Sequence, residues 1–279
     1  MTIADWLRAA QERLEHTHCP DPAIDARWIA EDVLHMNRSE LHFEALNALS
    51  REQLDVLNAD LERRAQGEPV QYILNRADFM GLKFYVDERV LIPRQDTESL
   101  VEAVIIDLQS RKKPRMLDLC CGSGAIGLSV KSLLSHVDVT LSDISTGALE
   151  VARKNAHALG ADVTVRHGDL FNAVGRDKFD LIASNPPYIP SGELAGLQRE
   201  VQYEPAIALD GGSDGLNIYR RIASEAGAHL KSGGSIYLEV GAGEAHDVLS
   251  LMTAHIEAEA SGILKDLTGV ERIVWIRSK

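Results

Sequence analysis

Apolar residues recur at helical spacing through the first 75 residues of the chain. The first such face consists of Ile3, Leu7, Ala10 and Leu14. Thr2 can cap this helix, and Asp21-Pro22 supplies a cap with proline at the first position of a second helix. Ser50 to Gln53 form a capping box ahead of a further helix, which Gly67 and Pro69 end. The pattern predicts a small helical bundle over residues 1–75.

The spacing of apolar residues changes at residue 76. Apolar and polar positions now alternate, with Phe79, Leu82, Phe84, Val86, Val90 and Ile92 on the apolar side. Alternation around Asp87-Glu88 predicts a β-hairpin over residues 76–93, which we expect to link two domains. Thr97 then stands at a cap position before a stretch with helical periodicity. We expect that helix to bury Leu100, Val101, Val104, Ile105 and Leu108.

From Pro114 onward, short apolar runs alternate with helical segments. This order is typical of a parallel sheet covered by helices. The expected strands are residues 116–119, 137–141, 163–165, 179–183, 236–240, 263–267 and 272–276, with a turn at Gly269 between the last two. We therefore predict an α/β fold, Rossmann-like, over residues 94–279. Its mostly parallel seven-stranded sheet ends in an antiparallel hairpin.

Composition narrows the classes of protein that fit. The 279 residues are 45% hydrophobic and 25% charged, which is enough apolar material for a sizeable core. No apolar run approaches the ~18 residues of a membrane span, and the N-terminus lacks a signal pattern. Three cysteines do not form a disulfide framework, so we expect a cytoplasmic protein without a membrane partner. The net charge of −13 argues against direct binding to nucleic acid.

Three residues near the N-terminus raise the question of a metal site. His16, His18 and Cys19 are all capable ligands. A zinc site needs a second ligand pair at suitable spacing, and the chain does not supply one. We therefore interpret these as ordinary loop residues and expect no metal.

The strand at residues 179–183 runs into Asn185, Pro186, Pro187 and Tyr188. A residue before proline is held extended, so the Asn185 amide should project from the strand's carboxyl end, where α/β sheets bind ligands. The Asn185 side-chain oxygen and the Pro186 carbonyl can each accept one hydrogen of a planar NH2 group. Tyr188 can stack on such a group. Together these residues are suited to holding an amide or amino nitrogen toward an electrophile, whereas Asn-Pro alone would indicate only a turn.

A glycine-rich loop follows the strand at residues 116–119. Its pattern Gly122-x-Gly124-x-x-Gly127, with Asp143 about 20 residues on, fits a dinucleotide fingerprint. A nicotinamide cofactor is therefore a competing interpretation, because an acid at the second strand end can hold ribose hydroxyls in any adenosine ligand. Residues 185–188 have no role in hydride transfer. They favour a methyl donor, whose cationic sulfonium also suits an acidic pocket.

The order and spacing of several short motifs resemble those of the release factor glutamine methyltransferase family. The matching stretches are 67–73, 79–84, 90–98, 118–126, 185–188, 203–216 and 266–272. Residues 1–66 match only in helical character. The chain departs from the family's usual residues at Gln95, Cys121 and Asp78, where proline, threonine and glutamate are usual.

The resemblance implies a class I methyltransferase that uses S-adenosylmethionine to methylate a side-chain nitrogen in class 1 peptide chain release factors. The methylated residue would be the glutamine of their GGQ motif, and the modification would tune translation termination. We expect the N-terminal bundle to dock the substrate, and a domain that only stabilises the enzyme is the alternative. Methylation of an adenine amine in DNA is the alternative, since DNA methyltransferases share this type of motif. Net charge and the lack of a basic, target-reading segment disfavour it.

Site roles follow by position from the same resemblance. The donor cradle would be Cys120, Cys121, Gly122, Ser123 and Gly124, bordered by Asn185. Asp143 would hold the donor ribose, Asp169 and Leu170 would flank its adenine, and Arg94 and Thr97 would cover its methionine end. The catalytic residues would be Asn185, Pro186, Pro187 and Tyr188. Asn185 and Pro186 would accept the substrate amide hydrogens, and Tyr188 would pack on the amide.

Overall fold

The computed structural model describes residues 1–17 and 19–279, which form two compact units. Unit 1 comprises residues 1–76 together with residues 198–203, and unit 2 comprises residues 77–197 and 204–279. The sequence pattern did not predict that residues 198–203 belong with the N-terminal helices. No described helix is long and apolar enough to cross a membrane.

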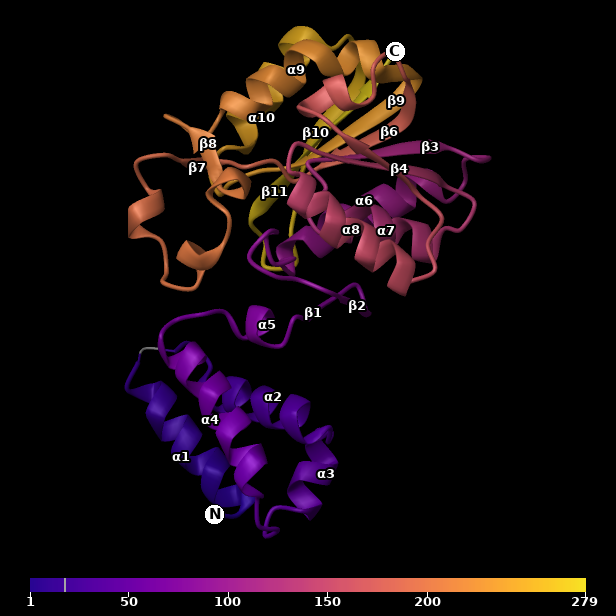
Figure 1. Cartoon of the computed structure of the whole chain (residues 1–279). Helices are drawn as coiled ribbons and strands as arrows, with labels where there is room; N and C mark the ends of the chain where they lie inside the picture. The colour runs from indigo at the N-terminus through magenta and orange to yellow at the C-terminus, as the bar shows by residue number, and fades with distance from the viewer. Residues whose placement is uncertain (18) are drawn as a thin grey trace. The chain divides into compact units, whose positions relative to one another are not determined.

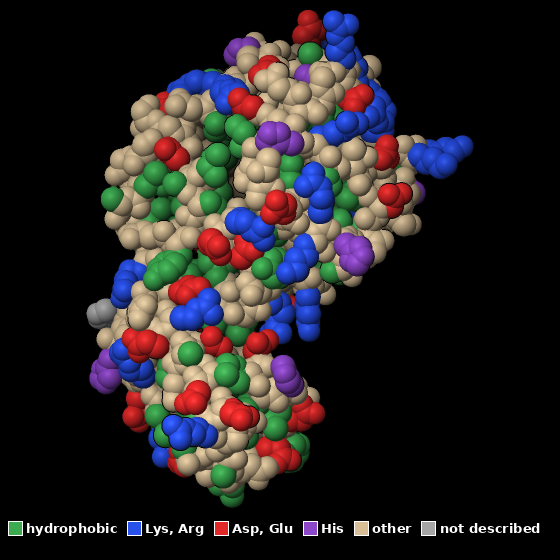
Figure 2. Space-filling view, viewed as in Figure 1, with side chains coloured by type: hydrophobic (Ala, Val, Ile, Leu, Met, Phe, Trp, Pro, Cys, Tyr) green, Lys and Arg blue, Asp and Glu red, His purple; other side chains and the backbone are tan. Residues whose placement is uncertain are grey.

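Unit 1 is a bundle of helices around an apolar core (Figure 1). Its helices are α1 (Ile3–Glu15), α2 (Pro22–Leu34), α3 (Arg38–Phe43), α4 (Arg51–Ala65) and α5 (Val70–Ile73). Ser50 forms the predicted capping box, and Thr2 caps α1 as predicted. Thr2 and Asn37 also form capping boxes, which the sequence pattern did not predict. Trp6, Leu14 and Leu57 are fully buried between the helices. Acidic side chains are interspersed with basic ones over the bundle's surface (Figure 2).

Arg64 explains why residues 198–203 belong to unit 1. Its side chain is only 3% exposed, and its Nε donates a 2.6 Å hydrogen bond to Asp25 Oδ2. The same guanidinium pairs with Glu200. Arg199 Nη2 adds a 2.7 Å bond to the carbonyl of Gln66. A buried guanidinium needs such partners. These polar contacts therefore hold residues 198–203 in unit 1, although the segment has no apolar periodicity that would predict this.

The hairpin lies earlier in the chain than the alternation predicted. Its strands are β1 (Ala77–Phe79) and β2 (Leu82–Phe84), and the turn is at Met80 and Gly81. Both turn residues have positive φ, +51° and +73°. The predicted hairpin around Asp87-Glu88 is wrong: Asp87 to Val90 form a turn, with a 3.1 Å bond from Val90 N to Asp87 O, but the paired strands of the hairpin are β1 and β2. Asp87 also accepts hydrogen bonds from the Arg89 guanidinium.

Unit 2 contains the predicted seven-stranded sheet. Its strands are β3 (Arg115–Leu119), β4 (Asp138–Asp143), β5 (Thr164–His167), β6 (Phe179–Ser184), β9 (Leu230–Glu239), β10 (Ala258–Lys265) and β11 (Glu271–Ser278). The order is β10-β11-β9-β6-β3-β4-β5. Strand β11 is antiparallel to both of its neighbours, β10 and β9, and strands β9, β6, β3, β4 and β5 are parallel to one another. From β3 the chain first adds β4 and β5 on one side and then β6 and β9 on the other side. Ligands of open α/β sheets bind at the carboxyl ends of the strands where the direction of winding changes in this way.

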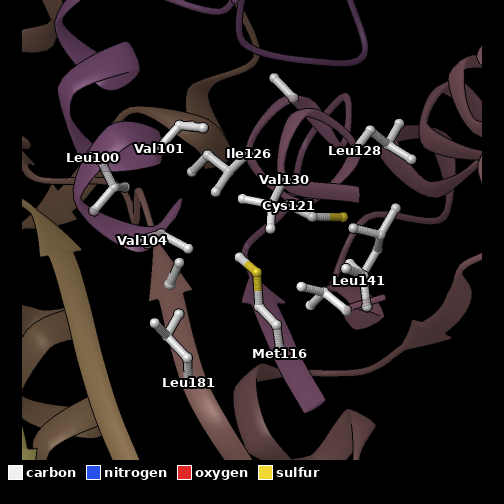
Figure 3. Close-up of a cluster of buried hydrophobic side chains, with 14 of the residues drawn as sticks. Leu100, Val101, Val104, Met116, Cys121, Ile126, Leu128, Val130, Leu141 and Leu181 are labelled. Carbon is white, nitrogen blue, oxygen red and sulfur yellow. The ribbon is translucent and has the colours of Figure 1, made fainter. Parts of the chain in front are cut away.

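Helices cover both faces of this sheet (Figure 1). One face carries α6 (Asp96–Leu108), α7 (Ala125–Leu133) and α8 (Thr146–Ala158), and the other carries α9 (Asn217–His229) and α10 (Ala245–His255). Successive β3 residues point to opposite cores: Met116 packs below α6 and α7 (Figure 3), and Leu117 packs with the α9 side. Burial on both faces accounts for the unbroken apolar runs in the sequence.

The start of α6 differs from the prediction. The helix begins at Asp96 after Gln95, and no side chain caps it. Thr97 lies in the first turn, is only 4% exposed, and directs its hydroxyl elsewhere. The predicted cap at Thr97 is therefore wrong. Gln95 has φ −62°, which is the value proline imposes, so the departure from proline there needs no change of backbone.

Candidate active site

A cavity of ≈ 380 Å³ opens at the carboxyl ends of the parallel strands in unit 2. It brings together most of the predicted site residues: Cys120, Cys121, Gly122, Ser123, Asp143, Asp169, Leu170, Asn185 and Pro187, with Arg94 and Thr97. Gly124, Pro186 and Tyr188 are not part of its lining. The lining also includes a stretch that the site predictions omitted, Pro205 to Ala208.

The loop after β3 turns sharply around the cavity. Cys120 and Gly122 have φ of +60° and +53°, and this left-handed conformation is strained for a cysteine. The next residue, Cys121, donates a 2.9 Å bond from its backbone N to Ser142 O on β4. Gly127 has a different purpose: a Cβ there would lie 2.4 Å from Leu141 Cδ2. The third glycine of the pattern thus allows α7 to pack closely on β4, while the first allows the loop to curve.

Cys121 faces the protein core. Its side chain belongs to the buried apolar cluster with Met116, Ile126 and Leu141 (Figure 3). Burial raises the pKa of its thiol well above the usual value, so the thiol stays neutral. The departure from threonine at this position therefore changes core packing, and the loop's backbone groups remain available to a ligand.

Asp143 joins this loop to the end of β4. Its Oδ2 accepts a 2.9 Å bond from Gly122 N, and its Oδ1 accepts a 2.8 Å bond from Ser145 N. Burial raises the pKa of the carboxyl, and these backbone donors oppose that rise. Each carboxylate oxygen has two lone pairs, so Asp143 can still accept hydroxyl groups from a ligand.

Asp118, at the end of β3, was not among the predicted site residues. It is completely buried, and its Oδ2 accepts a 2.8 Å bond from Gly127 N. Its Oδ1 has no hydrogen-bond partner within the described part of the chain. Burial raises its pKa to about 7, and the nearby Asp143 charge adds to the effect. Two crowded carboxyls beside a cavity suit a cationic ligand, which would favour their charged forms. This observation fits S-adenosylmethionine.

Asn185 follows β6 and is half-buried at the cavity wall. Its Nδ2 donates a 3.3 Å bond to Thr97 Oγ1, which is why Thr97 sits in the helix rather than at its cap. An amide carries its nitrogen and oxygen on opposite sides. The bond to Thr97 therefore leaves Asn185 Oδ1 as an acceptor for a ligand.

Tyr188 is held through its backbone by a glycine-rich segment. Strand β7 (Ile189–Pro190) pairs with β8 (Asp210–Gly212) (Figure 1). This pairing brings residues 210–215 against residues 185–188. A Cβ on Gly215 would lie 2.4 Å from Tyr188 O, and one on Gly211 would lie 2.7 Å from Tyr188 Cα. Close approach here requires glycine at both positions. The Tyr188 ring packs on the core beside α9, and burial raises the pKa of its hydroxyl to about 12.

Two ion pairs fix the cavity's edges. Arg94 pairs with Glu204, and Glu204 Oε2 also accepts a 3.2 Å bond from the buried Ile92 N. This ties the segment before α6 to the segment that starts at Glu204. On another edge, Asp169 Oδ2 lies 2.7 Å from Arg221 Nη2. Glu204 and Arg221 were missed because their partners are far away in sequence.

Comparison with known proteins identifies the family. A profile of the PrmC N-terminal domain matches residues 5–74, and one of the methyltransferase small domain matches residues 96–198. The release factor glutamine methyltransferase of Geobacter sulfurreducens is 38% identical, over 98% of this chain and 94% of that protein. The Caulobacter vibrioides enzyme of the same name is also 38% identical, over 98% and 96%. The chain belongs to the release factor glutamine methyltransferase family.

Solved structures agree in fold with this family assignment. A methyltransferase from Pyrococcus furiosus aligns with a TM-score of 0.51 at 16% identity, covering 82% of this chain and 98% of that one. A T. thermophilus 16S rRNA methyltransferase (RsmC), solved with AdoMet and guanosine, aligns with a TM-score of 0.52 at 18% identity, covering 73% and 50%. The protein is an S-adenosylmethionine-dependent methyltransferase with the predicted Rossmann-like fold.

Of the three N-terminal residues considered as metal ligands, His16, His18 and Cys19, His18 lies outside the described residues. Across residues 1–17 and 19–279, no group of three or more histidine, cysteine or acidic side chains is placed to hold an ion.

Proposed function

We propose that this protein methylates the side-chain nitrogen of a glutamine, that of the GGQ motif, in class 1 peptide chain release factors. One observation carries the proposal: Asn185 lines the same cavity as the glycine-rich loop after β3 and Asp143 at the end of β4. Relatives named for this reaction align with 98% of the chain. Such a substrate would place the enzyme in the cytoplasm.

The donor would lie against the loop from Cys120 to Ser123. When bound, S-adenosylmethionine supplies an electrophilic methyl group on a cationic sulfonium. Asp143 would accept its ribose hydroxyls, and Asp169 and Leu170 would border its adenine. Burial raises the pKa values of Asp118 and Asp143 beside the cavity, and a bound cation would favour their charged forms, whereas the pyrophosphate of a nicotinamide cofactor would disfavour them.

The substrate amide would be oriented by acceptors only. Its nitrogen is a poor nucleophile because the lone pair is delocalised into the carbonyl. Asn185 Oδ1 and the Pro186 carbonyl would each take one hydrogen, while Tyr188 would pack beside the amide plane. Fixing the nitrogen in this way supplies catalysis by proximity, for which well-oriented reactions gain roughly 7–11 kcal/mol.

A methyltransfer assay with two possible substrates tests the proposal. The full-length protein would be incubated with isotope-labelled S-adenosylmethionine and either an intact class 1 release factor or duplex DNA. Mass spectrometry should locate one added methyl group on the GGQ glutamine and none on DNA. Label transferred to adenine, with the release factor unmodified, would overturn the proposal.

A further inference from the structure

We propose that Glu239 is a positioning residue for Asn185. Its buried carboxylate, acting with Thr97, holds the Asn185 amide with its nitrogen turned into the protein and its oxygen available to the substrate. This inference rests on the function proposed above and adds to it a residue that does not line the cavity.

Strand register places the two side chains together. In the parallel pair of β6 and β9, Ser184 lies opposite Leu238. Asn185 directly follows the end of β6 and Glu239 is the last residue of β9, so the two residues lie beside each other at the carboxyl edge of the sheet. Thr97 Oγ1 completes the group through its 3.3 Å bond from Asn185 Nδ2.

The Glu239 carboxylate is an unusual component of a sheet core. It is only 2% exposed, and its Oε2 has no hydrogen-bond partner among the described residues. Burying a carboxylate is costly, and a leucine or glutamine there would avoid that cost. A carboxylate, however, accepts hydrogen bonds and never donates them, so it selects donors in its neighbours.

The preference of a carboxylate for donors matters because a side-chain amide can rotate by about 180° with little change of shape. The two ends of the Asn185 amide are nearly identical in size, and only hydrogen bonds distinguish them. The Thr97 hydroxyl and the Asn185 side chain both lower the pKa of the Glu239 carboxyl against the effect of burial, so both favour its charged form. A charged Glu239 therefore keeps Asn185 Nδ2 inward and Oδ1 outward. A protonated or neutral side chain in its place would permit the opposite orientation.

The charge on Glu239 should change near neutral pH. Burial raises its pKa to about 7, against the opposing effects of Thr97, Arg272 and Asn185, while Asp96 adds to the rise. Arg272 approaches from β11 and Asp96 from α6. Tyr188 and Tyr219 are further titratable neighbours of Glu239, and burial raises both of their pKa values further from neutrality.

The pH profile therefore separates two buried acids. Turnover at saturating substrates should rise through about pH 7 as Glu239 loses its proton and fixes Asn185. Asp118 has a similar pKa, but it lies at the end of β3, just before the donor loop, so its ionisation should alter the KM for S-adenosylmethionine. The two effects appear in different kinetic parameters.

The test compares variants of the full-length enzyme on an intact release factor. Glu239→Gln keeps the shape and removes the charge. It should lower kcat about tenfold or more, by analogy with other misplaced catalytic groups, and remove the rise of kcat near neutral pH. The KM for S-adenosylmethionine should stay within about twofold of wild type on the same reasoning. Glu239→Asp restores the charge and should recover the pH-dependent rise.

Tyr219→Phe is the matched control. Its hydroxyl donates a 2.7 Å bond to the backbone carbonyl of Glu239, so the variant removes a buried contact on the same residue and spares the carboxylate. Stability should fall while the pH profile of kcat remains. Wild-type kcat and an unchanged profile in Glu239→Gln would overturn the inference. If Glu239→Gln does not fold, a wild-type kcat that is flat between about pH 6 and 8 would overturn it equally. A wild type that never methylates the release factor would instead refute the proposed function.

Discussion

Gly122 and Asp143 are joined by a 2.9 Å hydrogen bond from the backbone amide to Oδ2. This bond connects the loop after β3 to the end of β4, two segments that each supply part of the cavity wall. The acid therefore fixes the shape of the loop and also presents acceptors to a ligand. Replacing Asp143 should therefore weaken donor binding both by altering the loop and by removing acceptors for the ligand.

Replacing Asp143 tests the donor assignment. Asp143→Ala removes acceptors for the loop and for ribose hydroxyls, and hydrogen bonds to charged groups are worth roughly 1.5–3 kcal/mol. Affinity for S-adenosylmethionine, measured by calorimetry, should fall about 10–100-fold. Asp143→Asn keeps one acceptor oxygen and should lose less. Unchanged affinity in the alanine variant would reject the assignment.

Donor binding should depend on pH. Burial raises the pKa of Asp118 to about 7 and raises that of Asp143. A cationic donor favours the deprotonated acids, so affinity should increase as pH rises through neutrality. S-adenosylhomocysteine lacks the sulfonium charge and should show a shallower dependence. Equal pH dependence for the two ligands, measured by calorimetry, would contradict this interpretation.

The approach of Gly215 to Tyr188 gives a steric prediction. Gly215 has φ +78°, and an added Cβ would lie 2.4 Å from Tyr188 O. Gly215→Ala should displace the motif and reduce turnover severely. Gly175→Ala is its control, since Gly175 also has a positive φ, +61°, but has open space around the new Cβ. That variant should lose only the roughly 1–3 kcal/mol of backbone strain in a denaturant titration and keep its turnover. Similar turnover in both variants would show that contact with Tyr188 is unimportant.

Arg64 gives a prediction for unit 1. Arg64→Met leaves Asp25 buried without its partner and releases Glu200. Breaking a buried pair in this way costs about 3–5 kcal/mol, which urea unfolding should detect. We propose that unit 1 docks the release factor, so KM for that substrate should rise. Affinity for S-adenosylmethionine should not change, because the cavity lies within unit 2. Arg13→Met, which removes an exposed pair with Glu62, should have little effect. An unchanged KM for the release factor in Arg64→Met would contradict the docking role.

The sequence predicted the features that arise from local patterns. Apolar runs marked every strand of the large sheet, although β9 begins at Leu230 and β10 at Ala258, six and five residues before the predicted strands. Thr97 was misplaced because its hydroxyl bonds Asn185, which is 88 residues away. The turn at Met80 was missed because methionine with positive φ has no sequence signal. Residues 198–203 and Glu239 depend on contacts across the fold, which periodicity does not reveal.

The central claim concerns the oxygen of Asn185. Asn185→Ala removes the one acceptor of the motif that belongs to a side chain, since the Pro186 acceptor is a backbone carbonyl. Asn185→Asp keeps an acceptor oxygen and should retain more activity than alanine. Tyr188→Phe should be mild, because the ring packs on the core and the hydroxyl is not needed as a donor.

Single-turnover methylation of a release factor by Asn185→Ala, with donor affinity measured on the same preparation, tests this claim most directly. We predict a rate about 10²-fold below wild type, since misplacing a nucleophile by an ångström has that effect. Affinity for S-adenosylmethionine should be nearly unchanged. A near-wild-type rate with normal donor binding would contradict the account and show that the turn after β6 is only structural.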